Sequence, residues 1–287
     1  MAFRTVVVSS HSKLEYSLNY LVFKTVDEVK RINISEIHTL IIESTAVSIS
    51  SALLVELSKR KIKVIFCDEK KNPNCELISY YGDSISPKRI SEQILWSKEV
   101  KDKVWASIVK EKINNQATVI EGISSETATE LREYSLNVQA GDSTNREGHA
   151  AKVYFNRIYG SNFSRSSNDK RNIYLNYGYS LLLSQFNKVI VSKGYLTQIG
   201  IHHKNEFNHF NLSCDLMEPF RPLIDKKVFE LNEDNFKEEL IKLLSDSFEI
   251  GNQKQTLVNA IAIYCASVFK AMNTGEINNI KFCKINE

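Results

Sequence analysis

The densest group of side chains able to do chemistry lies in residues 200–222, GIHHKNEFNHFNLSCDLMEPFRP, where histidines, carboxylates and an arginine crowd a short span. If the chain is helical from Ser213 onward, Asp215 and Glu218 are three positions apart and point the same way. Paired carboxylates of this kind suit a hard divalent cation. Because proline disrupts a helix interior, Pro219 must lie in a first turn or at a kink. The segment therefore presents a candidate metal site.

A second candidate segment is NREGHAAKVYFNRIYG, residues 145–160. Asp142 or Thr144 could cap a helix here, and two alanines follow Glu147 by three and four positions on the same side of that helix. Small neighbours leave room beside the carboxylate for an ion, an imidazole and a phosphate. Glu147 is therefore the candidate acidic residue of this segment.

Both segments also have ordinary structural interpretations. An isolated glutamate on an amphipathic helix is usually a solvated surface residue. An acidic pair followed by Arg221 three residues later is often a ladder of ion pairs on a helix surface. Composition and spacing alone therefore leave the metal site and the surface ladder both open.

Short apolar runs rich in Val, Ile and Tyr predict a β-rich N-terminal region, with one face of the sheet buried. The expected strands are Thr5–Val8, Leu14–Leu18, Tyr20–Phe23, Ile37–Ile42, Ile62–Phe66 and Leu77–Tyr81. Leucines at helical spacing predict one helix over residues 50–61, packed on this sheet. Residues 70–76, KKNPNCE, are typical of a turn, and GDSISPKR, residues 82–89, indicates a domain boundary.

Beyond this boundary the period of the apolar residues changes from two to about 3.6. A long helix is expected around residues 90–108, and further helices at about 126–139, 143–159, 172–193, 213–230, 234–248 and 255–272. The predicted fold class is α+β. It consists of a small β-rich domain, residues 1–85, followed by a larger all-α catalytic domain, residues 86–287.

Composition limits the function classes. The 287 residues include 43% hydrophobic and 25% charged residues, which are globular proportions, and the net charge of +3 does not by itself indicate a polyanion partner. Five cysteines without a CxxC pair fit a reducing cytosol better than a disulfide framework. No apolar run approaches the roughly 18 residues of a membrane span. No phosphate-loop motif supports nucleotide-driven chemistry.

The order of three motifs goes further than composition. The chain resembles the CRISPR-associated integrase and endonuclease family Cas-one (Cas1) in three motifs, which follow one another as R-E-x-x-A-A, G-x-x-H and DLMEPFRP. The motifs look like those of the type II members, and the resemblance runs through the whole chain. It implies that Glu147, His203 and Glu218 are catalytic metal ligands, with Asp215 as a fourth acidic member that completes the shell or orients a ligand. The gap after G-x-x-H is one residue longer than in some relatives, so His202 stays an alternative to His203.

The resemblance also implies a reaction and its partners. Family members join the 3′-hydroxyl ends of a short duplex, the protospacer, to a CRISPR repeat by transesterification, with Mg²⁺ or Mn²⁺ as cofactor. Expected partners are double-stranded DNA, a second copy of the chain held through the β-domain, and the small protein Cas-two (Cas2) in a heterohexamer, in the bacterial cytoplasm. Two groups of cations could neutralise DNA phosphates: Lys88, Arg89, Lys98, Lys101 and Lys103, and Arg165, Lys170 and Arg171.

Two rival hypotheses are open at this point. The first is a catalytically inactive DNA-binding or scaffolding subunit with the same fold. The second is a zinc hydrolase that uses three histidines and a cysteine, His202, His203, His209 and Cys214. The zinc hypothesis is the weaker one, because the sequence has no H-E-x-x-H motif and no paired cysteines.

Overall fold

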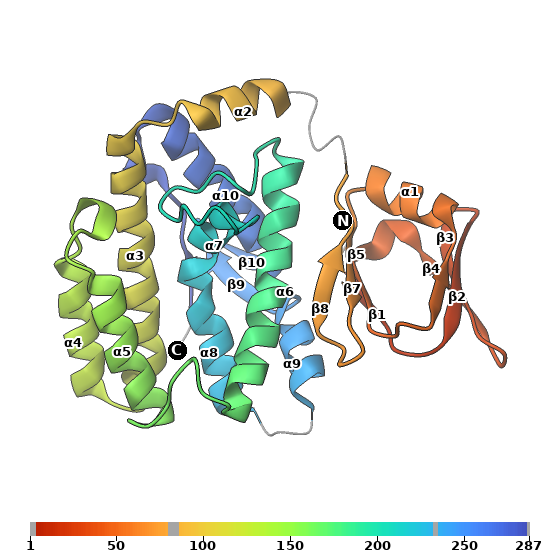
Figure 1. The fold of residues 1–287 in the computed structure, drawn as a ribbon, viewed down its shortest axis with the longest axis horizontal. Helices are drawn as coiled ribbons and strands as arrows, with labels where there is room; N and C mark the ends of the chain where they lie inside the picture. Colours follow the sequence, from red (N-terminus) through yellow and green to blue (C-terminus); the bar gives the residue numbers. More distant parts are fainter. Residues whose placement is uncertain (1–3, 80–85, 232–234, 286–287) are drawn as a thin grey trace. The chain divides into compact units, whose positions relative to one another are not determined.

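The computed structural model describes residues 4–79, 86–231 and 235–285. The chain divides into two compact units, residues 1–84 and 85–287 (Figure 1). The predicted linker near residue 85 falls within residues 80–85, outside the described part. The composition is α+β, with the first unit rich in strands and the second rich in helices.

In residues 4–79 the first unit holds two four-stranded sheets and one α-helix. One sheet has the order β1-β5-β7-β8, with β1, β5 and β7 parallel, and the other has the order β4-β3-β2-β6. The elements are β1 (Arg4–Val8), β2 (Ser12–Ser17), β3 (Tyr20–Lys24), β4 (Val29–Asn33), β5 (Ile37–Ile42), β6 (Val47–Ile49), α1 (Ser51–Lys59), β7 (Lys63–Cys67) and β8 (Pro73–Glu76).

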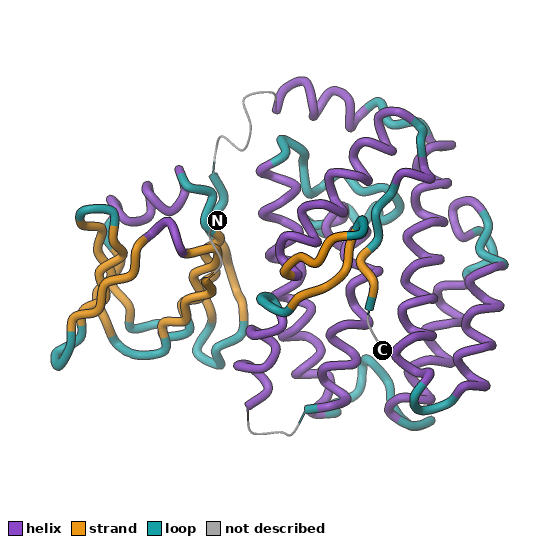
Figure 2. The backbone as a smooth tube through the Cα atoms, turned by 180° about the vertical axis from the view of Figure 1, so that it is seen from behind, coloured by secondary structure: helices purple, strands orange, loops and turns teal. Residues whose placement is uncertain are grey.

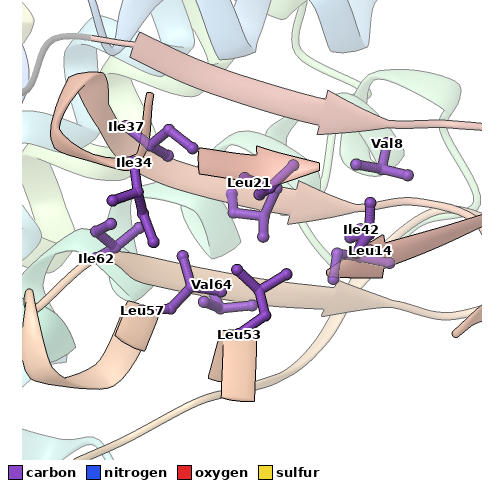
Figure 3. Close-up of a cluster of buried hydrophobic side chains, with 11 residues drawn as sticks. Val8, Leu14, Leu21, Ile34, Ile37, Ile42, Leu53, Leu57, Ile62 and Val64 are labelled. Atoms are coloured by element: carbon purple, nitrogen blue, oxygen red, sulfur yellow. The ribbon is translucent and has the colours of Figure 1, made fainter. Parts of the chain in front are cut away.

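Aliphatic side chains from both sheets and from α1 form the core of this unit (Figure 3). They are Val8, Leu14, Leu21, Ile34, Ile37, Leu40, Ile42, Leu53, Leu57, Ile62 and Val64. Burying each one contributes roughly 1.5–3 kcal/mol. The predicted helix over residues 50–61 is confirmed as α1, whose first turn is capped by the Ser50 side chain accepting from the backbone N of Leu53.

Several strand predictions need correction. The strand expected at Leu77–Tyr81 is instead β8, within the residues interpreted as a turn, and residues 80 and 81 lie outside the described part. Proline is tolerated in β8 because this is an edge strand. Leu18 and Asn19 have positive φ angles and form a two-residue turn between β2 and β3, so the alternating pattern stops at Ser17. β4 and β6 were not predicted.

In the second unit α3 packs against α4 and α5 and, on its other side, against α8 and α10 (Figures 1 and 2). The predicted helix at residues 90–108 is two helices, because Ser97 caps a new one. The elements are α2 (Ser86–Ile94), α3 (Lys98–Glu121), α4 (Ser125–Leu136), α5 (Arg146–Tyr159), α6 (Lys170–Ser192), α7 (Asn211–Met217), α8 (Arg221–Glu230), α9 (Phe236–Leu243) and α10 (Leu257–Thr274).

The prediction of an all-α second domain is wrong. Figure 2 shows a small antiparallel sheet of order β10-β9-β11, formed by β9 (Ser247–Ile250), β10 (Gln253–Thr256) and β11 (Cys283–Lys284). β9 and β10 are joined at Gly251 and Asn252, which both have positive φ, as a tight hairpin requires. Strands of two to four residues are too short to show a period, so the sequence predicts only the helices at about 234–248 and 255–272 and no element at residues 249–254 or after 272.

One helix in the described part, α10, is long and apolar enough to span a membrane by length and composition alone. Half of its apolar window is buried inside the protein, and it packs against α6, α3 and β9. A core helix passes the same test of length and composition, and we interpret α10 as one.

Candidate metal centre

Glu147 is positioned by the N-terminus of α5. The Asp142 carboxylate accepts hydrogen bonds from the backbone N of Arg146 at 2.8 Å and of Glu147 at 3.1 Å. Of the two predicted caps, the structure therefore uses Asp142. Because a helix N-terminus favours negative charge, this position supports both carboxylates. Ala150, one turn later, is completely buried.

Glu218 is positioned by a break in the predicted helix 213–230. α7 ends at Met217, a 3-10 turn covers Glu218–Phe220, and α8 begins at Arg221. Pro219 lies in the first turn of that short segment, so the expectation of an irregularity there is confirmed. Asn115 of α3 donates a 2.8 Å hydrogen bond to the carbonyl of Pro219, which ties the break to α3.

Lys112 of α3 brings the two glutamates together. Its Nζ lies 2.6 Å from Glu147 Oε1 and 2.5 Å from Glu218 Oε2, so these two oxygens are within about 5 Å of each other. Arg221 Nε donates to the other Glu218 oxygen, Oε1, at 2.8 Å. Glu218 is 4% exposed, whereas the Glu147 side chain is 24% exposed. Two carboxylates from distant parts of the sequence therefore converge on one ammonium group.

Asp215 faces the G-x-x-H loop instead of Lys112. It is fully buried, and its carboxylate accepts from the backbone N of Ile201, His202 and His203 at 2.6, 3.0 and 3.1 Å and from His203 Nδ1 at 2.5 Å. A Cβ at Gly200 would lie 2.4 Å from the His203 carbonyl oxygen, which explains the glycine of this motif. These contacts fix the His203 ring and leave Nε2 as its available ring nitrogen.

The two adjacent histidines have different surroundings. The His202 ring stacks on Trp105 of α3 with centroids 4.4 Å apart and planes at 3°. Trp105 meets the His203 ring at its edge, 5.7 Å away and at 86°. His203 is thus held between the Asp215 carboxylate and the Trp105 ring, whereas His202 is a stacking residue.

Electrostatics link these groups. The hydrogen bond that His203 donates to the Asp215 carboxylate raises the pKa of His203, and the charges of Glu218 and Glu147 raise it further. Burial opposes ionisation of Glu218, but Arg221 and Lys112 outweigh burial and lower its pKa to about 2. The imidazole and both glutamates therefore share one electrostatic environment.

The structure brings Glu147 and Glu218 to Lys112, and Asp215 to His203. Within residues 4–79, 86–231 and 235–285, no three His, Cys, Asp or Glu side chains are already gathered at the spacing of a metal site. The same result leaves the zinc set of His202, His203, His209 and Cys214 unassembled. No disulfide joins the five cysteines, which all lie in the described ranges.

Sequence reasoning missed Lys112. One signal could have found it: α3 buries Ile108, Ile113 and Gln116, and Lys112 lies in this stripe, four residues after Ile108. A lysine on the buried face of a helix needs acidic partners, because an unpaired buried charge is costly.

A further buried carboxylate, Asp225 of α8, lies beside the site. The Tyr179 hydroxyl donates to Asp225 Oδ1, and the Arg221 guanidinium lies over the Tyr179 ring, 4.6 Å from its centroid. Burial raises the pKa of Asp225 to about 7, although Tyr179 and Arg221 oppose this shift. The Arg221 guanidinium is therefore positioned by the Tyr179 ring, whose hydroxyl is hydrogen-bonded to Asp225.

This pKa predicts a dependence of stability on pH. The pKa of Asp225 is higher in the folded state than in the unfolded state, where it is near 4. Its contribution to the stability of the folded state is therefore fully present below pH 4 and is lost as the pH rises through 7. Asp225→Asn keeps an acceptor for Tyr179 but cannot ionise. When the pH of a urea unfolding experiment is raised from 5 to 9, we expect the free energy of unfolding of the wild type to fall by about 2–4 kcal/mol more than that of the variant.

The difference between the two proteins isolates Asp225. Burial also raises the pKa of Glu111 to about 7, but Glu111 is present in both. Parallel stability profiles for wild type and Asp225→Asn would show that Asp225 does not titrate in this range.

The chain is similar to known proteins over most of its length. The family described as CRISPR associated protein Cas1 matches residues 5–248. The chain is 31% identical over 271 residues to the CRISPR-associated endonuclease Cas1 of Neisseria meningitidis serogroup C (strain 8013), and this match covers 91% of the chain and 89% of the relative.

Solved structures share the fold. A casposase bound to integration product matches with a TM-score of 0.76 at 17% identity, over 95% of this chain and 91% of the casposase. A chain of a Cas6-RT-Cas1–Cas2 complex matches with a TM-score of 0.75 at 17% identity, over 99% of this chain but only 36% of that longer one. At these identities the likeness is one of fold alone. The match over residues 5–248 and the meningococcal relative establish the family: this chain belongs to the CRISPR associated protein Cas1 family.

Proposed function

We propose that this protein is a divalent-metal-dependent DNA integrase and endonuclease of CRISPR adaptation, which joins the 3′-hydroxyl ends of a protospacer to the CRISPR repeat by transesterification. The observation that carries the proposal is the convergence of Glu147 and Glu218 on the ammonium group of Lys112. The charges of both glutamates also raise the pKa of His203. The name of the meningococcal relative, an endonuclease, supports an enzymatic role.

The donor set fits Mg²⁺ or Mn²⁺. Carboxylate oxygens suit both ions, and one imidazole favours Mn²⁺ without excluding Mg²⁺. Glu147, Glu218 and Nε2 of His203 would hold the ion. The Asp215 carboxylate is engaged by four donors, so we assign it to orienting His203 instead of binding the metal. A bound ion would neutralise the charge that develops on the phosphate and on the leaving 3′-oxygen.

The chain's own residues prepare this site for a phosphodiester. Arg221 holds one oxygen of Glu218 in place, and Asp215 fixes the ring of His203. The His203 side chain is 42% exposed, so an incoming DNA strand can reach it.

A basic hollow beside the site suits the DNA backbone. A depression of about 470 Å³ is lined by Lys98, Lys101 and Lys204, together with Trp96 and His202. Lys98 pairs with Asp102 at the helix surface, where its side chain is 86% exposed. Exposed ion pairs are worth little, so phosphate groups can compete for such lysines, with the salt dependence typical of phosphate neutralisation.

The expected assembly follows from the same role. We propose that the protein forms a homodimer and assembles with Cas2 into a heterohexamer. This complex would bind double-stranded DNA in the bacterial cytoplasm. The solved complex that shares the fold contains both Cas1 and Cas2, which supports a Cas2 partner.

The test is an integration assay with purified protein, Cas2, a short duplex with free 3′-hydroxyl ends and a supercoiled plasmid that carries the repeat. We expect integration with Mn²⁺ or Mg²⁺ and none with EDTA. His203→Ala should reduce integration by about 10²-fold or more, because it removes a metal donor. His209→Ala is the matched control, since His209 is an exposed histidine of the same segment that does not line the hollow.

Two results would contradict the proposal. One is integration that does not depend on divalent cation. The other is full activity of His203→Ala, which would favour the inactive scaffolding subunit if duplex binding is also unchanged.

A further inference from the structure

Lys112 has an unusual position for a lysine. It is 9% exposed, on the buried face of α3, and its ammonium makes two short charge-assisted contacts with Glu147 and Glu218. The other Glu218 oxygen is held by Arg221. Both oxygens of Glu218 are therefore already bound to cations, and a third cation at this carboxylate would be repelled by the two positive charges already there.

We propose that Lys112 is a resident cation that occupies the place of the divalent metal between Glu147 and Glu218, and that metal binding displaces its ammonium from at least one of them. This inference rests on the metal site of the proposed function.

Charge balance supports this role. Two carboxylates within about 5 Å of each other repel strongly when they are largely removed from water. Lys112 and Arg221 together neutralise Glu147 and Glu218. A divalent cation that entered without displacing Lys112 would add two positive charges to a balanced group, whereas exchange with the ammonium adds only one. The ammonium and the metal therefore compete for the same two oxygens.

The competition is measurable as metal affinity. Lys112→Met keeps an unbranched side chain but removes the charge. We expect metal-free full-length Lys112→Met to bind Mn²⁺ roughly tenfold to hundredfold more tightly than the wild type in calorimetric titration. The factor corresponds to the one or two hydrogen bonds to charged groups that the metal no longer has to break.

Thermal unfolding gives an independent readout. Without metal, Lys112→Met should have a lower Tm than the wild type, because a buried carboxylate loses its partner. Added Mn²⁺ should restore most of this loss, since it replaces the ammonium. The matched control is Lys63→Met: Lys63 is 2% exposed and paired with Glu76 in the first unit, so its loss should lower the Tm, and Mn²⁺ should raise that Tm only as much as it raises the Tm of the wild type.

The outcomes separate the possibilities. If Lys112→Met binds Mn²⁺ no more tightly than the wild type, Lys112 supports the ligands and the inference is wrong. If neither protein binds Mn²⁺, the proposed metal site fails together with the inference. If Lys112→Met binds Mn²⁺ more tightly than the wild type but Mn²⁺ does not restore its Tm, the metal does not take the place of the ammonium, and the inference also fails.

A measurement on the wild type covers the case in which Lys112→Met does not fold. The ¹⁵Nζ resonances of the lysine ammonium groups can be followed during a titration with Mg²⁺, with the buried Lys63 identified by its loss in Lys63→Met. We expect the Lys112 resonance to shift or broaden and that of Lys63 to stay unchanged. A Lys112 resonance that is unchanged at saturating Mg²⁺ would overturn the inference.

Discussion

Glu147→Gln is expected to reduce integration by about 10²- to 10⁴-fold with little loss of stability. The variant keeps the shape of the side chain and an oxygen that can accept from Lys112, but it removes the negative charge that a hard divalent cation requires. A metal ion supplies several kcal/mol of charge stabilisation in phosphoryl transfer, and each 1.36 kcal/mol corresponds to a factor of ten in rate. The measurement is integration of a labelled duplex into the repeat plasmid at saturating Mn²⁺.

Stability should change little because Glu147 is near the surface. Its side chain is 24% exposed, so Lys112 and water can rearrange around the amide, and Lys112 keeps Glu218 as a partner. Glu126→Gln is the matched control, since Glu126 also lies in the first turn of a helix, α4, but is exposed and outside the site. Equal activity of Glu147→Gln and Glu126→Gln would remove Glu147 from the metal site.

The helices of the second unit were largely predictable because they are long and capped. α5, α6 and α10 each show several turns of the apolar period, and Gly160 and Gly275 end two of them with positive φ angles. β9 and β10 have four residues each, and β4 has an exposed, charged sequence at a sheet edge. Neither case gives a period that distinguishes a strand from its surroundings, because pairing with neighbouring strands creates these elements.

The resemblance carried by three motifs predicts Glu147, His203 and Glu218 as members of the candidate site and leaves two roles open for Asp215. The contacts among these residues could not be predicted. The contact of Asp215 with three successive backbone N–H groups depends on the path of the loop after Gly200. Lys112 joins the two glutamates only because α3 packs against both α5 and the break before α8. Tertiary packing of this kind leaves almost no mark on local sequence.

Asp215→Asn tests that loop, and we expect it to reduce both stability and metal affinity. The wild-type carboxylate accepts from the backbone N of Ile201, His202 and His203 and from His203 Nδ1 in a fully buried place. An asparagine offers one oxygen, and its amide group would direct N–H donors at donors. At about 1–3 kcal/mol for each buried group left unsatisfied, the free energy of unfolding should fall by about 3–5 kcal/mol.

The two possible roles of Asp215 predict different combinations of effects. If Asp215 orients His203, the variant should bind Mn²⁺ about 10- to 100-fold more weakly, as for other groups that support a ligand, together with the loss of stability in urea unfolding. If Asp215 were itself a ligand, integration would fall as far as in Glu147→Gln, with the same loss of stability, because its hydrogen bonds are made without the metal. Glu206→Gln, at an exposed carboxylate in the same loop, is the control for both measurements. Because four donors already surround Asp215, we expect the first combination, in which Mn²⁺ binds about 10- to 100-fold more weakly.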